Sequence, residues 1–316
     1  MADKIVVTGA TGFLGRHLVP VLAQRYGAEN VVGLSSQDYD LMNPEQVKRM
    51  FADYKPNVLV HLAAYSGGIG ANRAYPADFY YKNTLLTALM FHEAARNKVK
   101  KMIYPMGGCS YPATARSPID EGQMWNGFPQ QESAGYSTAK MMGIVASKSY
   151  RTQHGLNSVV LIPGNMYGEY DNFRSQESHV VPAMVRRYYE AQRLGDKQIV
   201  MWGTGKPTRD FVYAGDVAAV FPYFIEQYDS SEPVNISTGT AMQIRNLAES
   251  IKKITGFEGE IVWDTSKPDG QMEKIFGVKR LNDLSLFCKT PLQDGLTRTI
   301  DWFSRNYEER TDGIRL

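Results

Sequence analysis

KIVVTGATGFLG, residues 4–15, joins a short apolar run to a glycine-rich turn. The run from Lys4 to Thr8 is rich in β-branched residues, which predicts a fully buried parallel strand. Helical apolar spacing follows from Phe13 to Tyr26. Glycines between a strand and a helix permit a tight turn and let the backbone approach a diphosphate at the helix N-terminus. The stretch therefore predicts a dinucleotide site; the alternative is a structural turn whose glycines serve only close packing.

The alternation of strand and helix continues through the first half of the chain. Further strand signals lie at residues 31–34, 57–62, 101–106 and 158–162, and helical spacing lies at residues 44–54, 76–97 and 133–150. This rhythm predicts βαβ units on a doubly wound parallel Rossmann sheet, an α/β fold. Ligands of such a sheet bind beyond the carboxyl ends of the strands.

After Pro163 the rhythm changes. Loops rich in glycine, proline and aromatic residues alternate with short helices at about 180–193 and 244–255. We interpret this half as a smaller, mainly C-terminal α/β lobe that binds the substrate. The expected dinucleotide-binding domain spans residues 1–164 plus about 210–240, and the expected substrate-binding lobe spans about 165–209 plus 241–316.

The composition excludes several classes of protein. The 316 residues include 35 Lys and Arg against 33 Asp and Glu, a net charge of +2, so bulk charge does not indicate a nucleic-acid partner. Cys109 and Cys288 are too few for a disulfide framework or a cysteine metal site, and they favour a reducing compartment. No apolar stretch approaches the ~18 residues of a membrane helix, and no signal-peptide pattern precedes the first strand. We expect a cytoplasmic protein with no membrane partner and no metal.

The end of the second predicted strand bears on the choice of dinucleotide. NAD-binding proteins usually place an acidic residue there, which hydrogen-bonds the ribose hydroxyls. This chain instead has Leu34-Ser-Ser-Gln37, with no carboxylate before Asp38 and Asp40. Serine hydroxyls can donate to a 2′-phosphate, which favours NADP(H), whereas the lack of an arginine at this point leaves NAD(H) open. Arg16 is either a phosphate contact or an exposed residue of the first helical turn.

A tyrosine–lysine pair, Tyr136 and Lys140 in YSTAK, begins the helix after the fourth predicted strand. Residues four apart share one helix face, so the phenol and the ammonium can reach the same ligand. A nearby cation lowers the pKa of a tyrosine, and we therefore expect Tyr136 to exchange a proton beside a hydride-transfer site. The spacing alone is common on solvated helices, and the glycine turn earlier in the chain favours the catalytic interpretation.

With these motifs the chain resembles the extended short-chain dehydrogenase/reductases that act on nucleotide sugars. Within that family it is most similar to the GDP-L-fucose synthases, which epimerise and reduce GDP-4-keto-6-deoxymannose. GATGFLG, YSTAK and LAA (62–64) carry the family resemblance. The closer similarity rests on segments that follow the family's order along nearly the whole chain: GGIGANRAYPADFYYKN (67–83), CSYP (109–112), NMYGEYDNF (165–173), SHVVPAMVRR (178–187), WGTGKPTRDF (202–211) and SKPDG (266–270).

The resemblance implies roles for individual residues. Cys109 and His179 match the family's proton-exchanging pair, which acts on the carbons beside the sugar ketone; a thiol and an imidazole both exchange protons near neutral pH. Tyr136 and Lys140 match the hydride-transfer pair. The residues that match the GDP-sugar site are Arg187, Trp202, Arg209 and Asp269. The residues that match the cofactor site, besides Lys140 and His179, are Gly9, Thr11, Gly12, Phe13, Leu14, Gly15, Ser36, Asp40, Leu41, Leu62, Ala63, Ala64, Asn83, Pro163, Asn165 and Met166.

One departure from the family lies directly before Cys109. The family has Gly-Ser-Ser-Cys where this chain has Met106-Gly107-Gly108-Cys109. Gly107 thus replaces the serine that completes a Ser-Tyr-Lys triad and hydrogen-bonds the sugar carbonyl. Removing one hydrogen bond of this kind costs about 10²–10³ in rate. Strand alternation should point Ser110 elsewhere unless the loop bends.

Three functions follow as hypotheses. The first is an NADP(H)-dependent epimerase/reductase of a GDP-4-keto-6-deoxyhexose, and the second is a GDP-hexose or GDP-heptose epimerase with little or no net reduction. The third, a nucleotide-sensing protein without turnover, is opposed by the retained proton-transfer groups. The resemblance also implies a homodimer formed through helices near 80–97 and 135–150. We expect His61 to be a core histidine and Cys288 a small buried hydrophobe.

Overall fold

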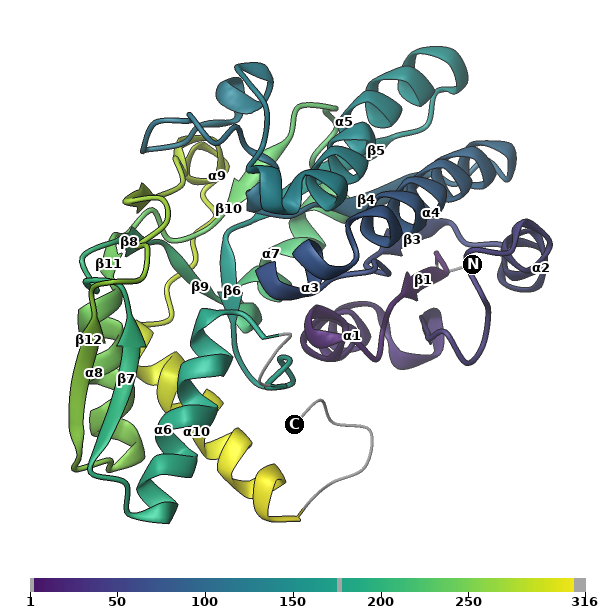
Figure 1. The fold of residues 1–316 in the computed structure, drawn as a ribbon. Helices are drawn as coiled ribbons and strands as arrows, with labels where there is room; N and C mark the ends of the chain where they lie inside the picture. Colours follow the sequence, from purple (N-terminus) through teal and green to yellow (C-terminus); the bar gives the residue numbers. More distant parts are fainter. Residues whose placement is uncertain (1–2, 175–177, 310–316) are drawn as a thin grey trace.

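Figure 1 shows the computed structural model, which describes residues 3–174 and 178–309. Its centre is a six-stranded sheet in the order β10-β5-β4-β3-β1-β2, in which every neighbouring pair is parallel. The strands are β1 (Ile5–Thr8), β2 (Val31–Leu34), β3 (Val58–His61), β4 (Lys101–Pro105), β5 (Ser158–Pro163) and β10 (Val234–Ile236). This is a doubly wound parallel order of the Rossmann type, with its reversal next to β1, so the predicted fold class is confirmed.

The strand order reverses between β1 and β3, because the chain leaves β1 toward β2 on one side and returns to β3 on the other. Open α/β sheets bind ligands at such a switch point, outside the carboxyl ends of the strands. The glycine turn (residues 9–15) follows β1, and residues 62–64 follow β3. Both segments therefore meet where a dinucleotide is expected.

Helices cover both faces of this sheet because side chains alternate between two apolar cores along each strand. Val6 and Leu59 belong to one core, and Val7 and Val60 belong to the other. Figure 1 shows α4 and α5 side by side, and they are in contact along their length. The helices over the first core are α2 (Pro44–Tyr54), α4 (Pro76–Arg96) and α5 (Ala134–His154), and those over the second are α1 (Phe13–Tyr26) and α7 (Ala214–Glu226).

Several boundaries agree with the sequence predictions. α1, β2, α2 and α8 (Ile244–Thr255) begin and end at the predicted residues, and α4 and β4 end one residue early. α2 begins sharply because the Asn43 side chain accepts hydrogen bonds from two N–H groups of its first turn, and Pro44 occupies the first helical position. α5 continues past its predicted end to His154 and stops at Gly155, which has a left-handed backbone.

The C-terminal half adds elements that the sequence did not predict, including β10, α7 and a third apolar core. That core lies among α6 (Val180–Leu194), α8, α10 (Leu292–Glu309) and the parallel pair β7 (Gln198–Trp202) and β12 (Glu260–Asp264). We propose that these elements belong to the substrate-binding lobe, with the boundaries given above. The remaining strands are β6 (Asn165–Tyr167) paired with β9 (Phe211–Tyr213), and β8 (Thr208–Arg209) between β11 (Met242–Gln243) and β13 (Glu273–Lys274). The remaining helices and 3-10 turns are α3 (Ile69–Ala74), α9 (Lys279–Asp283), η1 (Ala28–Asn30), η2 (Gly108–Ser110), η3 (Glu121–Trp125) and η4 (Gln131–Ser133).

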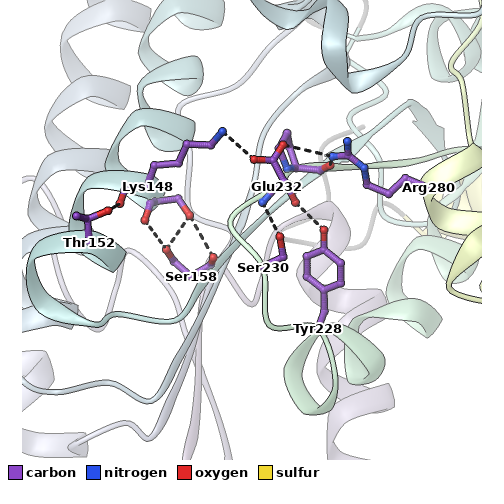
Figure 2. Close-up of polar contacts among 9 residues, drawn as sticks. Lys148, Thr152, Ser158, Tyr228, Ser230, Glu232 and Arg280 are labelled. Carbon is purple, nitrogen blue, oxygen red and sulfur yellow. Dashed lines mark hydrogen bonds and ion pairs between the residues drawn. The ribbon is translucent and has the colours of Figure 1, made fainter.

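A polar network fastens α5 to the loop that precedes β10 (Figure 2). Glu232 forms an ion pair with Lys148 of α5 at 2.9 Å and faces Arg280 of α9 at 3.9 Å. Its carbonyl accepts a hydrogen bond from the Tyr228 hydroxyl, and its N–H donates to the Ser230 hydroxyl. The ion-paired side chains are half exposed, so each pair contributes about 0–1 kcal/mol. Together they hold the loop that brings β10 to the edge of the sheet.

Within residues 3–174 and 178–309, no helix combines the length and the apolar character needed to cross a membrane. The same residues contain no group of three or more His, Cys, Asp or Glu side chains that could hold a metal ion. Cys109 and Cys288 are both free thiols.

Candidate active site

The glycine turn between β1 and α1 is packed so closely that two of its residues cannot carry a side chain. Gly9 has a φ of 72°, and a Cβ there would lie 2.7 Å from the backbone nitrogen of Ala63. A Cβ at Gly15 would lie 2.7 Å from the carbonyl carbon of Ala10. α1 begins after Gly12 with no side-chain cap and no acidic residue in its first turn. Its first N–H groups are thus open to an anion, as a dinucleotide diphosphate requires.

The two carboxylates that follow β2 are engaged within their own turns. The Asp38 carboxylate accepts hydrogen bonds from the Ser35 N–H at 2.7 Å and the Ser35 hydroxyl at 2.8 Å, and these bonds lower the pKa of Asp38. The Asp40 carboxylate accepts one from the Met42 N–H at 3.0 Å. Ser36 is exposed beside them. The contact of Ser36 with a ribose therefore stays a prediction.

Other predicted cofactor residues lie at the same end of the sheet. Pro163 ends β5, and the side-chain N–H of Asn165 on β6 donates to the Asp210 carbonyl at 2.8 Å. Asn83 of α4 is buried, and its amide bonds both backbone groups of Tyr65. Both asparagines thus position other segments of the protein, and their contact with a dinucleotide stays a prediction. The predicted cofactor residues that lie in or pack against the apolar cores are Leu14, Leu41, Leu62 and Met166.

Tyr136 and Lys140 lie in the first two turns of α5, on one face of the helix. Lys140 is only 4 % exposed, and its Nζ lies 4.0 Å from the centre of the Tyr104 ring on β4. A cation–π contact of this kind partly compensates a buried ammonium. The Tyr104 hydroxyl is hydrogen-bonded to Thr87 of α4 at 2.7 Å, which fixes the ring against the lysine.

The electrostatics of this pair differ from the prediction. Burial lowers the pKa of Lys140 to about 7, with the nearby Cys109 opposing the shift. Burial raises the pKa of Tyr136, and the Cys109 and Tyr104 side chains add to the rise. The expected lowering of the tyrosine pKa is therefore wrong for this structure, because desolvation of the phenolate outweighs the attraction of a lysine that is itself partly deprotonated. Tyr136 is a protonated phenol at neutral pH, the form that donates a proton.

Cys109 lies half-buried in η2, the turn directly after β4. The Ser137 hydroxyl, next to Tyr136 on α5, donates to the Cys109 carbonyl at 3.2 Å. This hydrogen bond ties the turn to the helix that carries the tyrosine and the lysine. The structure thus brings together Cys109, Tyr136 and Lys140, three of the four residues predicted to be catalytic.

Gly107 faces the same side chains. A Cβ there would lie 3.1 Å from the Cys109 Sγ and 3.5 Å from the Tyr136 hydroxyl. Its backbone, with φ −83° and ψ 142°, is open to any residue. By contrast, a Cβ at Gly108 would lie 2.8 Å from the Phe276 ring. Packing requires glycine at position 108, whereas position 107 admits a Cβ if the Cys109 and Tyr136 side chains shift by a few tenths of an ångström.

Two further polar residues lie close to this site. His61 on β3 is 1 % exposed; its Nδ1 is hydrogen-bonded to the Thr8 hydroxyl at 2.8 Å, and its Nε2 has no hydrogen-bond partner among the described residues. Burial and the Lys140 charge lower the pKa of His61 to about 3, so the ring is neutral. The hydroxyl of Ser110 is buried and likewise lacks a described partner. His61 is the predicted core histidine, with one ring nitrogen satisfied.

The predicted GDP-sugar residues lie around β7 and β8. Arg187 of α6 is exposed and donates to a carbonyl of β7 at 2.7 Å, and Trp202 at the end of β7 is 72 % exposed. Arg209 on β8 is partly buried, which lowers its pKa. The Asp269 carboxylate accepts hydrogen bonds from the N–H and the hydroxyl of Thr204, at 2.6 and 2.8 Å. Asp269 thus holds the turn between β7 and β8, and its contact with a nucleotide stays a prediction.

His179 stands at the N-cap position of α6 and is exposed. Its side chain makes no capping hydrogen bond, so the alternative role of a helix cap is not supported. Residues 175–177, just before it, lie outside the described part of the chain. The pairing of His179 with Cys109 therefore stays a prediction.

Two residues of the site carry no sequence signal. Tyr104 belongs to an apolar strand and supports Lys140 only because α5 packs against its ring. Lys274 on β13 is 9 % exposed and lies beside Arg209 in the register of the two paired strands. No spacing rule connects these positions, so only the folded chain brings them together.

Comparisons with known proteins show the family of the chain. A family model described as the NAD dependent epimerase/dehydratase family matches residues 5–237. GDP-L-fucose synthase 1 of Arabidopsis thaliana is 38 % identical over 96 % of this chain and 94 % of that protein. A solved GDP-6-OMe-4-keto-L-xylo-heptose reductase from C. jejuni has a TM-score of 0.90 at 28 % identity, over 96 % of this chain and 98 % of that one.

A solved GDP-L-fucose synthetase from Naegleria fowleri, bound to NADP, has a TM-score of 0.88 at 29 % identity, over 99 % of this chain and 96 % of that one. The similarity to these relatives extends over nearly the whole of both chains, so it includes the Rossmann sheet and the C-terminal elements alike. The chain therefore belongs to the NAD dependent epimerase/dehydratase family, the extended short-chain dehydrogenase/reductases, and its relatives there include GDP-L-fucose synthases.

Proposed function

We propose that this protein is an NADP(H)-dependent epimerase/reductase of a GDP-4-keto-6-deoxyhexose. The observation that carries the proposal is the meeting of Tyr136, Lys140 and Cys109 at the dinucleotide end of the sheet. A proton donor, a lysine and a proton-exchanging thiol in one site suit chemistry at a sugar ketone and its neighbouring carbons. The GDP-L-fucose synthases and the heptose reductase named above support the same reaction class.

In this proposal, Cys109 and His179 exchange the protons of the epimerisation. A hydrogen on a carbon beside a ketone is acidic because the electron pair left behind spreads onto the carbonyl oxygen as an enolate. Removing that proton to one residue and returning a proton from the other, on the opposite face, inverts the carbon. The Ser137 hydrogen bond holds the Cys109 turn in place for this exchange. The redox state of the sugar is unchanged in this half of the reaction.

In this proposal, Tyr136 and Lys140 assist the reduction. When bound, NADPH supplies the hydride to the ketone carbon. Tyr136, as a protonated phenol, donates its proton to the ketone oxygen as negative charge develops there. The Lys140 charge then stabilises the phenolate that remains. The first N–H groups of α1 hold the diphosphate of the dinucleotide, and Ser36 offers its hydroxyl near the ribose.

In this proposal, Arg187, Arg209 and Trp202 bind the GDP moiety. Arginine forks suit a diphosphate, and an exposed indole face suits a ring of the nucleotide.

Exposed apolar side chains on α4 and α5 support a homodimer. Two free thiols fit a reducing compartment such as the cytoplasm. The alternative function, a GDP-sugar epimerase without net reduction, is favoured only by the glycine at position 107. The protonated Tyr136 opposes this alternative, because a proton donor serves the reduction.

The test is to incubate the protein with GDP-4-keto-6-deoxymannose and NADPH in deuterated buffer. Loss of NADPH absorbance with deuterium on both carbons beside the ketone supports the proposal. Tyr136→Phe removes only the hydroxyl that donates the proton, so it should abolish NADPH consumption. The rate of deuterium uptake and the affinity for NADPH should stay within several-fold of the wild type. Deuterium uptake without NADPH consumption by the wild type would establish an epimerase alone, and absence of both would overturn the proposal. A GDP-4-keto-heptose in a parallel arm tests the choice of sugar.

A further inference from the structure

Phe276 is a fully buried aromatic residue, 1 % exposed, and none of the roles described so far uses its ring. It lies two positions beyond β13, and its N–H donates to the Asp210 carboxylate at 3.3 Å. The N–H of the next residue, Gly277, donates to the carbonyl of Ile119 at 2.8 Å. Hydrogen bonds thus join the segment around Phe276 both to the link between β8 and β9 and to the loop between η2 and η3.

The ring of Phe276 lies between two glycines at the ends of β4 and β5, which are neighbours in the sheet. A Cβ at Gly108, in the turn after β4, would lie 2.8 Å from the Cε1 atom of the ring. A Cβ at Gly164, directly after β5, would lie 3.2 Å from the opposite ring atom, Cδ2. Neither glycine has a positive φ, so the backbone conformation does not call for glycine at either position. The ring, with the Ser237 side chain beside Gly164, therefore fills the space that two side chains would otherwise take.

The contact with Gly108 bears on Cys109, the next residue of the same turn. The two residues share one planar peptide bond, so a movement of Gly108 is passed on to Cys109. The Ser137 hydroxyl of α5 donates to the Cys109 carbonyl at 3.2 Å, so α5 and the Phe276 ring hold this turn together. A displacement of about 1 Å at a reacting atom can cost about 10²-fold in rate, and proton exchange therefore depends on where the turn lies.

We propose that Phe276 is a positioning residue for Cys109. Its ring holds the turn after β4 at a fixed distance from the backbone that follows β5, and thereby sets where the sulfur lies relative to the sugar. The segment that carries the ring continues from β13, which pairs with β8 and Arg209. Phe276 thus relates the sulfur to a strand expected to bind GDP. The effect on the sugar rests on the proposed function, whereas the effect on the turn does not.

Amide hydrogen exchange of residues 106–112 measures the effect on the turn without substrate. Phe276→Leu keeps an apolar side chain but lacks the ring atoms that face Gly108. The Ser110 N–H, which donates to the Gly107 carbonyl at 3.0 Å within the turn, should then exchange about tenfold faster. Mass spectrometry of peptides digested after the exchange assigns the change to the turn.

Phe257→Leu is the matched control. Phe257 is 3 % exposed, belongs to the third apolar core and packs against the Tyr188 ring, with 5.8 Å between the ring centres. The two variants should lose comparable stability in urea denaturation, because each shortens a buried ring in a packed core. Phe257→Leu should nevertheless leave the exchange of residues 106–112 at the parent rate.

A second substitution tests the contact itself. In the Phe276→Leu background, Gly108→Ala places a methyl group in the space that the ring has left. It should return the exchange rate of the turn to within about threefold of the parent, since substitutions at residues in contact are not additive. Alone, Gly108→Ala forces its methyl group against the ring and should speed the exchange. A general loss of stability would instead add the effects of the two substitutions.

The keto sugar gives the readout on the reaction. Phe276→Leu should lower the maximal rate of deuterium uptake by about 10–100-fold, because the sulfur is displaced from the reacting carbon. The KM for the GDP-sugar and the affinity for NADPH should stay within several-fold, because no binding residue is removed. Phe257→Leu should keep the parent rate of deuterium uptake.

Unchanged exchange of residues 106–112 in folded Phe276→Leu overturns the proposal. Equal acceleration of exchange over the whole chain also overturns it, as do additive effects in the double variant. A more than tenfold rise in KM without a change in the turn would make Phe276 a part of the GDP site instead. A looser turn with an unchanged rate of deuterium uptake would mean that the ring does not position the sulfur. If the parent takes up no deuterium but the turn responds as expected, the proposed function fails and the hold of Phe276 on the turn stands.

Discussion

At position 107 a single missing side chain separates this chain from the triad of its family. The backbone there accepts any residue, and a Cβ would lie 3.1 Å from the Cys109 Sγ and 3.2 Å from the Tyr136 ring. These distances are short for carbon contacts, so both neighbours must shift by a few tenths of an ångström to admit a side chain. A serine hydroxyl placed there would lie near the Tyr136 hydroxyl, the group proposed to donate a proton to the ketone oxygen.

Gly107→Ser should therefore raise the rate of NADPH consumption relative to deuterium uptake, by about 10–100-fold, since it adds a hydrogen bond of the oxyanion type. Stopped-flow absorbance and mass spectrometry measure the two rates on one sample. Gly107→Ala is the matched control, because it introduces the same Cβ without the hydroxyl. Equal rates in the two variants, at equal Tm, would show that another group polarises the carbonyl.

Lys140 makes the free energy of unfolding of the protein depend on pH. Its pKa is about 7 in the folded protein against about 10.4 in an unfolded chain. Between these values the unfolded chain holds a proton that the folded chain lacks, so the free energy of unfolding rises as pH rises from about 7 toward 10. Below pH 7 both states hold the proton, and this group adds no further slope.

Lys140→Met should flatten that rise, measured as the urea midpoint of the ligand-free protein at several pH values. Other buried lysines contribute in the same direction, so the difference between variant and wild type is the quantity to compare. Lys148→Met on the same helix, where the lysine is half exposed and paired with Glu232, should keep the wild-type slope. A Lys140→Met curve parallel to the wild type between pH 7 and 10 would contradict the lowered pKa.

At the scale of elements, one buried carboxylate joins the strands that carry the substrate residues. Asp210, between β8 and β9, accepts hydrogen bonds from the Thr238 hydroxyl at 2.6 Å, the Gly239 N–H at 2.9 Å and the Phe276 N–H at 3.3 Å. It thereby connects β8, the loop after β10 and the segment after β13. The neighbouring Arg209 depends on this connection for its place in the site.

Asp210→Asn should lower the free energy of unfolding by about 2–4 kcal/mol, because an amide nitrogen would face at least one N–H donor and leave it unsatisfied. Urea denaturation measures the loss, and the KM for the GDP-sugar should rise with it. Asp283→Asn, at an exposed aspartate of α9, should change stability by no more than about 0.5 kcal/mol. Equal stability of the two variants would mean that the Asp210 contacts are not needed.

At the scale of the whole molecule, α4 and α5 present apolar side chains to solvent. Tyr80 and Tyr81 on α4 are 54 % and 60 % exposed, and Met142 and Val145 on α5 are 39 % and 45 % exposed. Met142 and Val145 are three apart and so share one helix face. Adjacent helices with exposed apolar faces are typical of a protein–protein interface.

We expect a homodimer through this surface. The double variant Met142→Glu and Val145→Glu should sediment as a monomer with an unchanged circular dichroism spectrum, since it places charges in an apolar contact. Phe287→Glu, at an apolar residue 47 % exposed between α9 and α10, is the control and should remain dimeric. A wild type that sediments as a monomer at micromolar concentration would disprove the dimer.

The fold and the common face of Tyr136 and Lys140 were predictable because their signals are local. A β-branched run, helical spacing and a glycine turn are properties of neighbouring residues, and α1, β2, α2 and α8 have the predicted boundaries. Tyr136 and Lys140 are four apart on one helix, so their common face followed from the spacing alone. The Gly107 substitution was likewise visible in the chain, and the family pattern indicated what it removes.

The electrostatics and the far side of the site depend on tertiary structure. Burial decides that the Tyr136 pKa rises and the Lys140 pKa falls, and burial is set by segments distant in sequence. β10 and β13 are two or three residues long, too short for a periodic signal, and only pairing with β5 and β8 makes them strands. Lys274 lies beside Arg209 through that pairing, because a strand's register is a contact between distant residues that no local pattern encodes.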